Sequence, residues 1–394
     1  MKFFLSCLWV ILLAGTACTA QTKEPLQKIV KIPLLTGAQQ PEKYLPILEG
    51  KKIALLVNQT SLYNDTTHLV DFLIQPGITV EKIFTPEHGF RGDADAGERV
   101  QDQQDPQTGL LIHSLYGRTK KPSPEMLKGL DLLVFDVQDV GARFYTYIST
   151  LHYLMEACAE VGLPLLILDR PNPNGHYVDG PVLDTAQHRS FVGMHPIPVV
   201  HGLTVAELAQ MINGQKWLPH GRTCSLTLIP CSGYTHQHPY ALPVPPSPNL
   251  PNARAVGLYP SLCFFEGTAI SVGRGTDFPF QVIGHPDLES GFSFTPQPNR
   301  GAKQPRYQNQ TCYGQDLRKS NFRYNHIQIE YLIDVYQKFP KKDQFFNSFF
   351  TKLAGNTTLE AQIKSGQTAQ QIRQSWQPDL EAYQILRKKY LLYP

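Results

Sequence analysis

The feature that most constrains the fold of this chain is a repeated alternation of short apolar runs with helical segments. The apolar runs are at 52–57, 80–84, 132–137, 164–168 and 197–200. Uninterrupted runs of this length are typical of strands that are buried on both faces of a parallel sheet. The alternation therefore predicts right-handed βαβ crossovers and an α/β fold with a Rossmann-like, doubly wound parallel sheet.

The segments between these runs carry helix signals. Helices are predicted at 66–74, 123–130, 147–161 and 204–213. Thr204 is followed three residues later by Glu207, which predicts a capping box at the start of the last helix. A dinucleotide is not implied, because no G-x-G-x-x-G motif follows the first predicted strand and no P-loop is present.

A proline-rich segment at 239–251 separates this region from the rest of the chain. Proline fixes φ and lacks an N–H donor, so the segment suits neither a helix nor a central strand. Helices are predicted beyond it at 253–265, 326–339, 367–376 and 379–392. We therefore expect a Rossmann-like catalytic domain at 45–238 and a second, smaller α+β domain at 252–394 that completes a cleft.

Residues 1–20 have the pattern of an export signal peptide. A positive start is followed by an apolar run and by small residues that lead to Cys18. The apolar run is too short to span a bilayer. We expect either cleavage after Ala20 or lipidation of Cys18, as in a lipoprotein. The protein is then exported, and is periplasmic or lipid-anchored to an envelope membrane.

The charge balance argues against nucleic acid as a partner. The chain has 394 residues, with 36 basic and 33 acidic side chains and a net charge of +3. A surface that binds nucleic acid normally shows as a basic excess or a basic stripe. We expect no nucleic-acid partner, and contact with a membrane only through an N-terminal lipid.

Polar clusters follow the ends of the predicted strands, at 85–91, 136–143, 169–174 and 201–202. The carboxyl ends of parallel strands lie along one edge of the sheet, where ligands bind in open α/β folds. The clusters therefore predict a polar crevice at that edge.

Glu87 is the leading catalytic candidate in these clusters. It lies between Pro86 and His88, and Phe84 and Phe90 are close in sequence. We expect partial desolvation to raise the pKa of its carboxyl, so that it keeps the proton that a general acid needs. Alternatively, Glu87 or His88 only caps a helix or binds loop amides. A zinc site at His88 is disfavoured, because no H-E-x-x-H motif is present.

Other charged residues of the clusters have a structural and a functional interpretation. Asp136, Asp139 and Asp169 are each candidates for a second carboxylate, but an aspartate beside an arginine more often forms a structural pair. Arg143 and Arg170 are better candidates, because a fixed guanidinium can bind a substrate carboxylate through two hydrogen bonds.

Two further groups of residues are candidates for a ligand site. Glu266, Thr268 and Arg274 combine an acid, a hydroxyl and a base with nearby glycines that let the backbone approach a ligand. Tyr147 suits either a sugar platform or the hydrophobic core.

Several sequence runs, in the same order, carry a family resemblance. They are Asn58-Gln59-Thr60, Pro86 to Gly92, Asp136 to Tyr147, Asp169 to Pro173, Phe265 to Thr268 and Gly273 to Thr276. Together they resemble the exo-acting β-N-acetylmuramidases of the NamZ/YbbC-like group, from about Lys51 to the C-terminus.

The resemblance implies a peptidoglycan-recycling glycoside hydrolase. Such an enzyme removes the terminal, non-reducing β-1,4-linked N-acetylmuramic acid from peptide-free fragments, so its partners are muramic-acid-terminated glycans. It also implies a cleft between the two domains, with Glu87 as the catalytic acid. The lactyl carboxylate of muramic acid suits Arg143, Arg170 or Arg274. None of the usual glycosidase routes requires a metal or an organic cofactor.

The candidate catalytic residues are Glu87 and His88, with Glu266 and Asp136 as candidates for the second group. The candidate substrate-binding residues are Asn58, Arg91, Gln138, Arg143, Tyr147, Asp169, Arg170, Asn172, Thr268 and Arg274. Retaining, inverting and substrate-assisted routes all stay open, because they differ in distances that a sequence does not contain. The alternatives are a non-catalytic lipoprotein that binds cell-wall glycans and a metal-dependent amidase or esterase.

Overall fold

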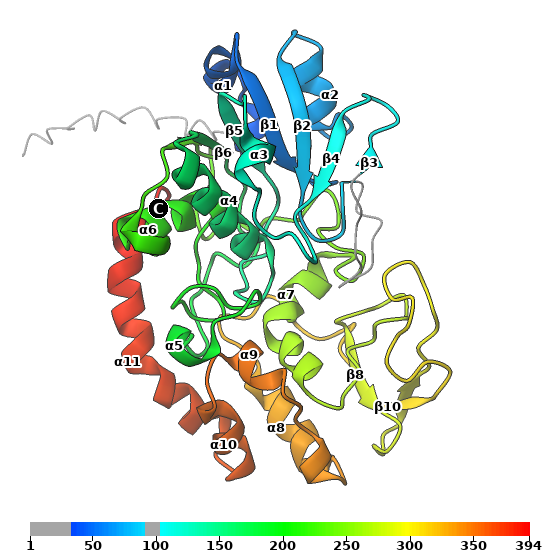
Figure 1. Cartoon of the computed structure of the whole chain (residues 1–394). Coiled ribbons are helices and arrows are strands. Elements are labelled where there is room, and N and C mark those ends of the chain that lie inside the picture. Colours follow the sequence, from blue (N-terminus) through cyan, green and yellow to red (C-terminus); the bar gives the residue numbers. More distant parts are fainter. Residues whose placement is uncertain (1–32, 91–102) are drawn as a thin grey trace, which may run out of the picture. The chain divides into compact units, whose positions relative to one another are not determined.

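The computed structural model describes residues 33–90 and 103–394. Strands of a large, mostly parallel sheet lie in the upper part of the view in Figure 1. They are β1 (Lys52–Val57), β2 (Thr79–Thr85), β3 (Gln103–Gln104), β4 (Leu111–Ser114), β5 (Leu132–Asp136), β6 (Leu165–Leu168) and β7 (Leu226–Ile229). Their spatial order is β3-β4-β2-β1-β5-β6-β7, with β3 and β4 antiparallel. The chain extends the sheet first on one side of β1 and then, from β5, on the other. This doubly wound order confirms the predicted fold class.

Helices cover both faces of this sheet (Figure 1). One face packs against α1 (Pro41–Leu48) and α2 (Leu69–Ile74), and the other against α3 (Pro124–Leu127), α4 (Tyr147–Val161) and α6 (Val205–Gly214). Along β1, Ile53, Leu55 and Val57 enter the core under α1 and α2, whereas Ala54 and Leu56 enter the opposite core. A strand directs successive side chains to opposite faces, so burial on both faces requires the unbroken apolar run.

The start of α6 confirms the predicted capping box. The Thr204 side chain accepts a hydrogen bond from the Glu207 N–H, and the Glu207 side chain accepts one from the Thr204 N–H at 2.8 Å. The two side chains thereby satisfy backbone donors that the first helical turn leaves unpaired.

The prediction of a strand at 197–200 is wrong. Val200 makes isolated bridges with Ala142 and Asp179 instead of joining a ladder. Pro196 and Pro198 lie on either side of Ile197, and proline has no N–H to donate to a neighbouring strand. The position beside β6 is taken by β7, which follows α6.

The C-terminal region contains a small antiparallel sheet and several helices. They are α7 (Ala253–Leu262), β8 (Val282–His285), β9 (Phe292–Phe294), β10 (Cys312–Asp316), α8 (Ile329–Lys338), α9 (Phe350–Ala354), α10 (Thr358–Lys364) and α11 (Ala369–Arg387), and a short α5 (Thr185–His188) lies earlier, after β6. The small sheet has the order β8-β10-β9, in agreement with the predicted smaller α+β region.

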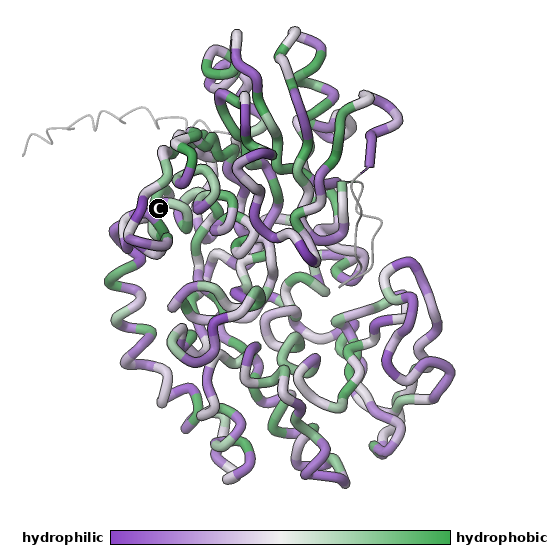
Figure 2. The backbone as a smooth tube through the Cα atoms, in the orientation of Figure 1, coloured by the Kyte–Doolittle hydropathy of each residue, from purple (hydrophilic) through white to green (hydrophobic). Residues whose placement is uncertain are grey.

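The prediction of two closing helices is wrong, because α11 continues through Pro378. Proline removes a hydrogen bond to the carbonyl four residues earlier, here that of Gln374. Both residues are exposed, so water can bind this carbonyl. Ile372, Trp376 and Leu380 form a continuous buried stripe along the inner side. In Figure 2, hydrophobic and hydrophilic residues alternate along α11 accordingly.

The hydrophobic core under α4 continues into the C-terminal region. Phe144, in the loop after β5, lies 5.7 Å from the ring of Phe264, and Phe264 lies 6.2 Å from Phe350. Residues 33–394 form one compact unit. The domain boundaries at 45–238 and 252–394 stay predictions.

The predicted signal peptide lies outside the described residues, as does Cys18. Among the residues that the structure does describe, we find no helix with the length and apolar character needed to cross a membrane.

Arg143 is the largest fully buried side chain of the described structure. Its Nη1 donates to the carbonyls of Pro181 and Ile197 at 2.7 and 2.8 Å, and its Nη2 donates to those of Leu353 and Ala354, both at 2.9 Å. Burial lowers the pKa of Arg143 to about 9. The guanidinium therefore joins the loop after β5 to three distant backbone segments.

We expect Arg143→Lys to destabilise the fold strongly. A single ammonium group cannot reach both pairs of carbonyls, and each buried carbonyl left without a donor costs about 1–3 kcal/mol. The free energy of unfolding, measured with urea, should fall by roughly 2–5 kcal/mol. The exposed Arg222→Lys is the control and should change it by less than about 0.5 kcal/mol. Equal values for the two variants would contradict this role of Arg143.

Candidate active site

A cavity of about 440 Å³ lies where the loops after β2, β4 and β5 meet the C-terminal region. Its walls combine acidic, basic, hydroxyl and aromatic side chains from segments far apart in sequence. Lining residues include Glu87, His88, Tyr116, Lys120, Tyr145, Thr146, Phe191, Ser247, Asn249, Tyr259, Glu266, Arg274, Phe280 and Phe349. Most of the lining residues that precede the proline-rich segment lie in loops at the carboxyl ends of sheet strands, as expected for an open α/β fold.

Glu87 enters the cavity from the turn after β2. His88 and Gly89 have φ of 72° and 75°, so two consecutive left-handed residues reverse the chain directly after Glu87. Such a conformation is unfavourable for a non-glycine residue, and it is a form of local strain found at functional sites. The Glu87 side chain is half-buried and the His88 side chain is buried, and both line the cavity.

Two hydroxyl side chains lie beside the Glu87 carboxyl group. Thr146, the N-cap residue of α4, donates from Oγ1 to Oε2 of Glu87 at 2.7 Å. Burial, together with the adjacent Glu87 carboxylate, raises the pKa of Tyr116, so its phenol keeps its proton. The carboxyl group is therefore held in one orientation while it still faces the cavity.

A second carboxyl group, that of Glu266, lines the same cavity. Nε of Arg274 donates to its Oε1 at 2.7 Å. The guanidinium of Arg274 also lies 5.1 Å from the ring centre of Phe280. Glu266 and Arg274 thus form a compensated ion pair in the part of the wall that the C-terminal region supplies, and Glu87 and Glu266 have different partners.

Aromatic side chains form another part of the wall. Tyr259 lies 5.5 Å from Phe144 and 5.9 Å from Tyr145, in both cases edge to face. All three line the cavity. Rings with a polar edge suit the apolar faces and hydroxyl groups of a sugar.

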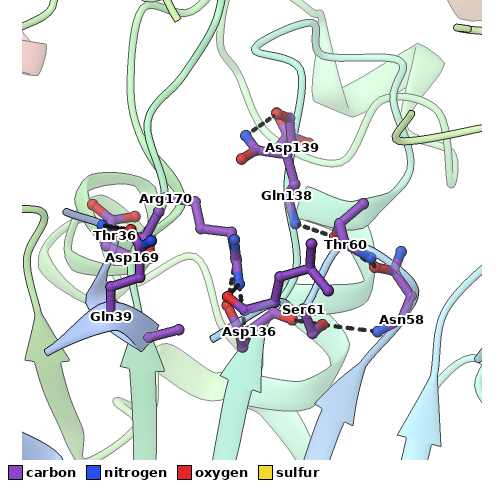
Figure 3. A network of polar contacts seen from close by, with 12 residues as sticks. Thr36, Gln39, Asn58, Thr60, Ser61, Asp136, Gln138, Asp139, Asp169 and Arg170 are labelled. Carbon is purple, nitrogen blue, oxygen red and sulfur yellow. Dashed lines mark hydrogen bonds and ion pairs between the residues drawn. The ribbon is translucent and has the colours of Figure 1, made fainter. Parts of the chain in front are cut away.

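Several predicted site residues form a buried polar network at the ends of β1, β5 and β6 (Figure 3). Arg170 donates from Nε and Nη2 to the two oxygens of Asp136 at 2.5 and 2.9 Å. Asn58 Oδ1 accepts from the hydroxyl of Thr60 at 2.6 Å, and that hydroxyl accepts from the N–H of Gln138 at 3.0 Å. These side chains bind one another and do not line the cavity.

Asp136 and Arg170 therefore adopt the structural pairing that the sequence left open. Their charges compensate each other in the interior, so neither faces the cavity as a second acid or as a carboxylate clamp. Arg143 is likewise bound to backbone carbonyls. The expectation that Arg143 or Arg170 meets a substrate carboxylate has no support in this geometry.

The remaining predicted residues also contact protein groups. Asp169 accepts from the N–H of Ala206 and from the hydroxyl of Tyr393, and burial raises its pKa to about 6. Others have buried partners within the protein and do not line the cavity: Tyr147 with Asn58, Asn172 with the Leu203 carbonyl, and Thr268 with the Phe265 carbonyl. Arg91 lies outside the described residues.

The structure thus brings Glu87, His88, Glu266 and Arg274 together in one cavity. Sequence reasoning missed Tyr116, Lys120 and Thr146, which also line it. Tyr116 and Lys120 follow β4, a short strand between β2 and the edge strand β3. Leu111 in β4 is 55% exposed, so no long apolar run marks this strand. Thr146 lies within a run that resembles the family, but nothing in its spacing indicates a contact with Glu87.

No cluster of three or more His, Cys, Asp or Glu side chains that suits a metal ion occurs within residues 33–90 and 103–394.

Comparisons with known families and sequences agree across nearly the whole chain. Residues 53–254 match the family model for the N-terminal region of exo-β-N-acetylmuramidase NamZ, and residues 257–393 match the model for its C-terminal region. The chain is 36% identical over 408 residues to the peptidoglycan β-N-acetylmuramidase NamZ of Bacillus subtilis (strain 168), with 96% of each chain covered.

Two crystal structures of DUF1343 family proteins from Bacteroides fragilis NCTC 9343 are similar to this structure. The first is 47% identical, with a TM-score of 0.86 and coverage of 92% of this chain and 99% of the other. The second is 29% identical, with a TM-score of 0.79 and coverage of 93% and 100%. The similarity therefore includes both the large sheet and the C-terminal region.

The carboxyl group of Asp139, in the loop after β5, should make the stability of the fold depend on pH. Burial raises its pKa to about 7, although Oδ2 accepts from the Gly141 N–H at 2.6 Å. In the unfolded chain the pKa is about 3.9. The folded state therefore holds more protons between these values, and stability should fall as pH rises from about 4 to about 7.

Asp139→Asn should remove this contribution, while its amide oxygen can still accept from Gly141. The contribution is on the order of 4 kcal/mol at most over that interval. Urea unfolding at several pH values measures it as the difference between wild type and variant. The exposed Asp65→Asn is the control and should follow the wild-type curve. Parallel curves for wild type and Asp139→Asn would show that Asp139 does not titrate as argued.

Proposed function

Because the chain belongs to the exo-β-N-acetylmuramidase NamZ family and is thus a glycoside hydrolase, we propose the following reaction. The protein hydrolyses the β-1,4 bond of the terminal, non-reducing N-acetylmuramic acid in peptide-free peptidoglycan fragments, with Glu87 as general acid. The observation that carries the proposal is the Glu87 carboxyl group, half-buried and fixed by Thr146, in a cavity of sugar size that also holds a second carboxyl group.

The proposed role of Glu87 is to donate its proton to the glycosidic oxygen as the bond to the anomeric carbon breaks. The leaving sugar then departs as a neutral alcohol, and water supplies the hydroxyl group of the released N-acetylmuramic acid. The second proton of that water goes to a base and restores the acid. General acid catalysis of this kind is typical of glycosidases that carry a pair of carboxyl groups.

Glu266 is the better candidate for the second catalytic group. It lines the cavity, and the hydrogen bond from Nε of Arg274 at 2.7 Å fixes the orientation of its carboxyl group. Asp136 is less suitable, because both its oxygens are bound by Arg170 outside the cavity. A route assisted by the acetamido oxygen of the substrate would use Glu266 as a positioning group instead.

The proposed location of the protein rests on its N-terminal sequence. The export signal at 1–20 and Cys18 support a periplasmic or lipid-anchored enzyme. Peptidoglycan fragments arise in that compartment, which agrees with the proposed substrate.

Glu87→Gln should abolish turnover and spare substrate binding. The amide keeps the shape of the side chain but has no acidic proton to give, so kcat should fall by about 100-fold or more. Mass spectrometry of a muramic-acid-terminated disaccharide should show free N-acetylmuramic acid with the wild type only. Glu81→Gln, an exposed change on the same strand, is the control and should retain full activity.

Two outcomes would contradict the proposal in different ways. Normal turnover by Glu87→Gln would remove Glu87 as the acid. A wild-type protein that binds the disaccharide without cleaving it would favour the glycan-binding alternative.

Thr146→Val should lower kcat about tenfold with little change in KM, because it removes the hydrogen bond that orients Glu87. Thr146→Ser keeps the hydroxyl group and should retain most of the activity. Steady-state kinetics on a chromogenic β-N-acetylmuramide measures both variants. An equal loss in the two would assign the effect to packing of the loop, and not to the hydroxyl group.

A further inference from the structure

The described lining of the cavity carries two permanent positive charges, on Arg274 and Lys120. They differ in their partners. Arg274 is bound to Glu266 at 2.7 Å, so its charge is compensated within the protein. A substrate carboxylate placed there would compete with Glu266 and meet its negative charge.

Lys120 has no carboxylate within ion-pair distance among the described residues. Its Nζ lies 4.5 Å from the ring centre of Phe191, a contact that stabilises a cation but accepts none of its three hydrogen bonds in the ordinary sense. The adjacent Lys121 differs, because its Nζ lies 2.8 Å from Glu156 and 3.0 Å from Glu160. Of the two neighbouring lysines, the one at the cavity keeps its charge uncompensated.

Lys120 and Glu87 belong to one continuous wall. Tyr116 lies beside the Glu87 carboxyl group, and its ring centre is 6.0 Å from that of Phe191, over which Lys120 lies. Two aromatic rings therefore separate the acid from the cation. In N-acetylmuramic acid, the bond to be cleaved starts at C1 and the lactyl carboxylate extends from O3, so the groups that would meet the acid and the cation also lie on different atoms of the sugar ring.

We propose that Lys120 binds the lactyl carboxylate and thereby selects N-acetylmuramic acid over N-acetylglucosamine, which lacks the lactyl group. This inference rests on the proposed function and assigns its specificity to a residue. The carboxylate accepts a charge-assisted hydrogen bond from Nζ, in a cavity whose described lining otherwise carries two carboxyl groups and one paired guanidinium. A neutral N-acetylglucosamine gains nothing from this contact.

The test is a double-mutant cycle between the lysine and the substrate. The substrates are 4-nitrophenyl β-N-acetylmuramide and its lactyl methyl ester, which has no negative charge. Lys120→Met should lower kcat/KM for the acid by about 10- to 100-fold and leave that for the ester nearly unchanged. Lys120→Arg should retain most of the preference for the acid. Lys121→Met removes the same charge outside the cavity and should keep the wild-type preference.

Each outcome separates the two proposals. If the wild type cleaves the muramide but Lys120→Met loses activity equally on acid and ester, or on neither, Lys120 does not bind the carboxylate and the proposed function stands. If the wild type cleaves neither substrate, the proposed function and this inference both fail. Binding of free N-acetylmuramic acid to Glu87→Gln, with and without Lys120→Met, gives a readout that does not depend on turnover and should weaken by the same factor.

Discussion

The described structure depends on how one buried cation, Arg143, is solvated by the backbone. Among the described residues, its guanidinium has no carboxylate partner and donates to four carbonyls, two of them in the C-terminal segment at Leu353 and Ala354. The four hydrogen bonds from Nη1 and Nη2 offset the cost of burying this charge, although Nε has no partner among the described residues, so these segments have to meet around the guanidinium. The same loop continues to Thr146, which contacts Glu87. The geometry of the acid is thus coupled to the joining of the sheet with the C-terminal region.

The polar residues at the strand ends divide into two functional groups. One group, which includes Asp136 and Arg170, compensates its own charges and fixes the loops after β1, β5 and β6 (Figure 3). The other group, which includes Glu87 and Glu266, faces the cavity. A rigid polar network beneath an active site holds the reacting groups in place, which is the condition for efficient catalysis by preorganised side chains. The motifs that resemble the family therefore include both residues that fix the fold and residues that line the cavity.

The cavity places two carboxyl groups in different environments. Glu87 has hydroxyl neighbours, whereas Glu266 has a guanidinium. A pair of carboxyl groups with different neighbours suits the two different roles, acid and base or nucleophile, that such a pair has in glycosidases. Lys120 adds a positive charge that is complementary to an anionic sugar and has no carboxylate partner among the described residues. The proposed acid, the second carboxyl group and the proposed carboxylate-binding lysine thus come from three different segments, two at strand ends and one in the C-terminal region.

The sequence by itself determined the α/β class, most of the parallel strands, the capping box at Thr204 and the place of Glu87 just after the end of a strand, because these follow from local patterns of burial and capping. Local patterns failed where tertiary contacts decide. Prolines keep 197–200 out of the sheet, and Pro378 is accommodated in α11 because its face is exposed to water. Whether an arginine binds an aspartate, four carbonyls or a glutamate depends on which segments meet in space. Only the tertiary structure could therefore separate Arg143 and Arg170 from Arg274, and bring Lys120 and Thr146 to Glu87.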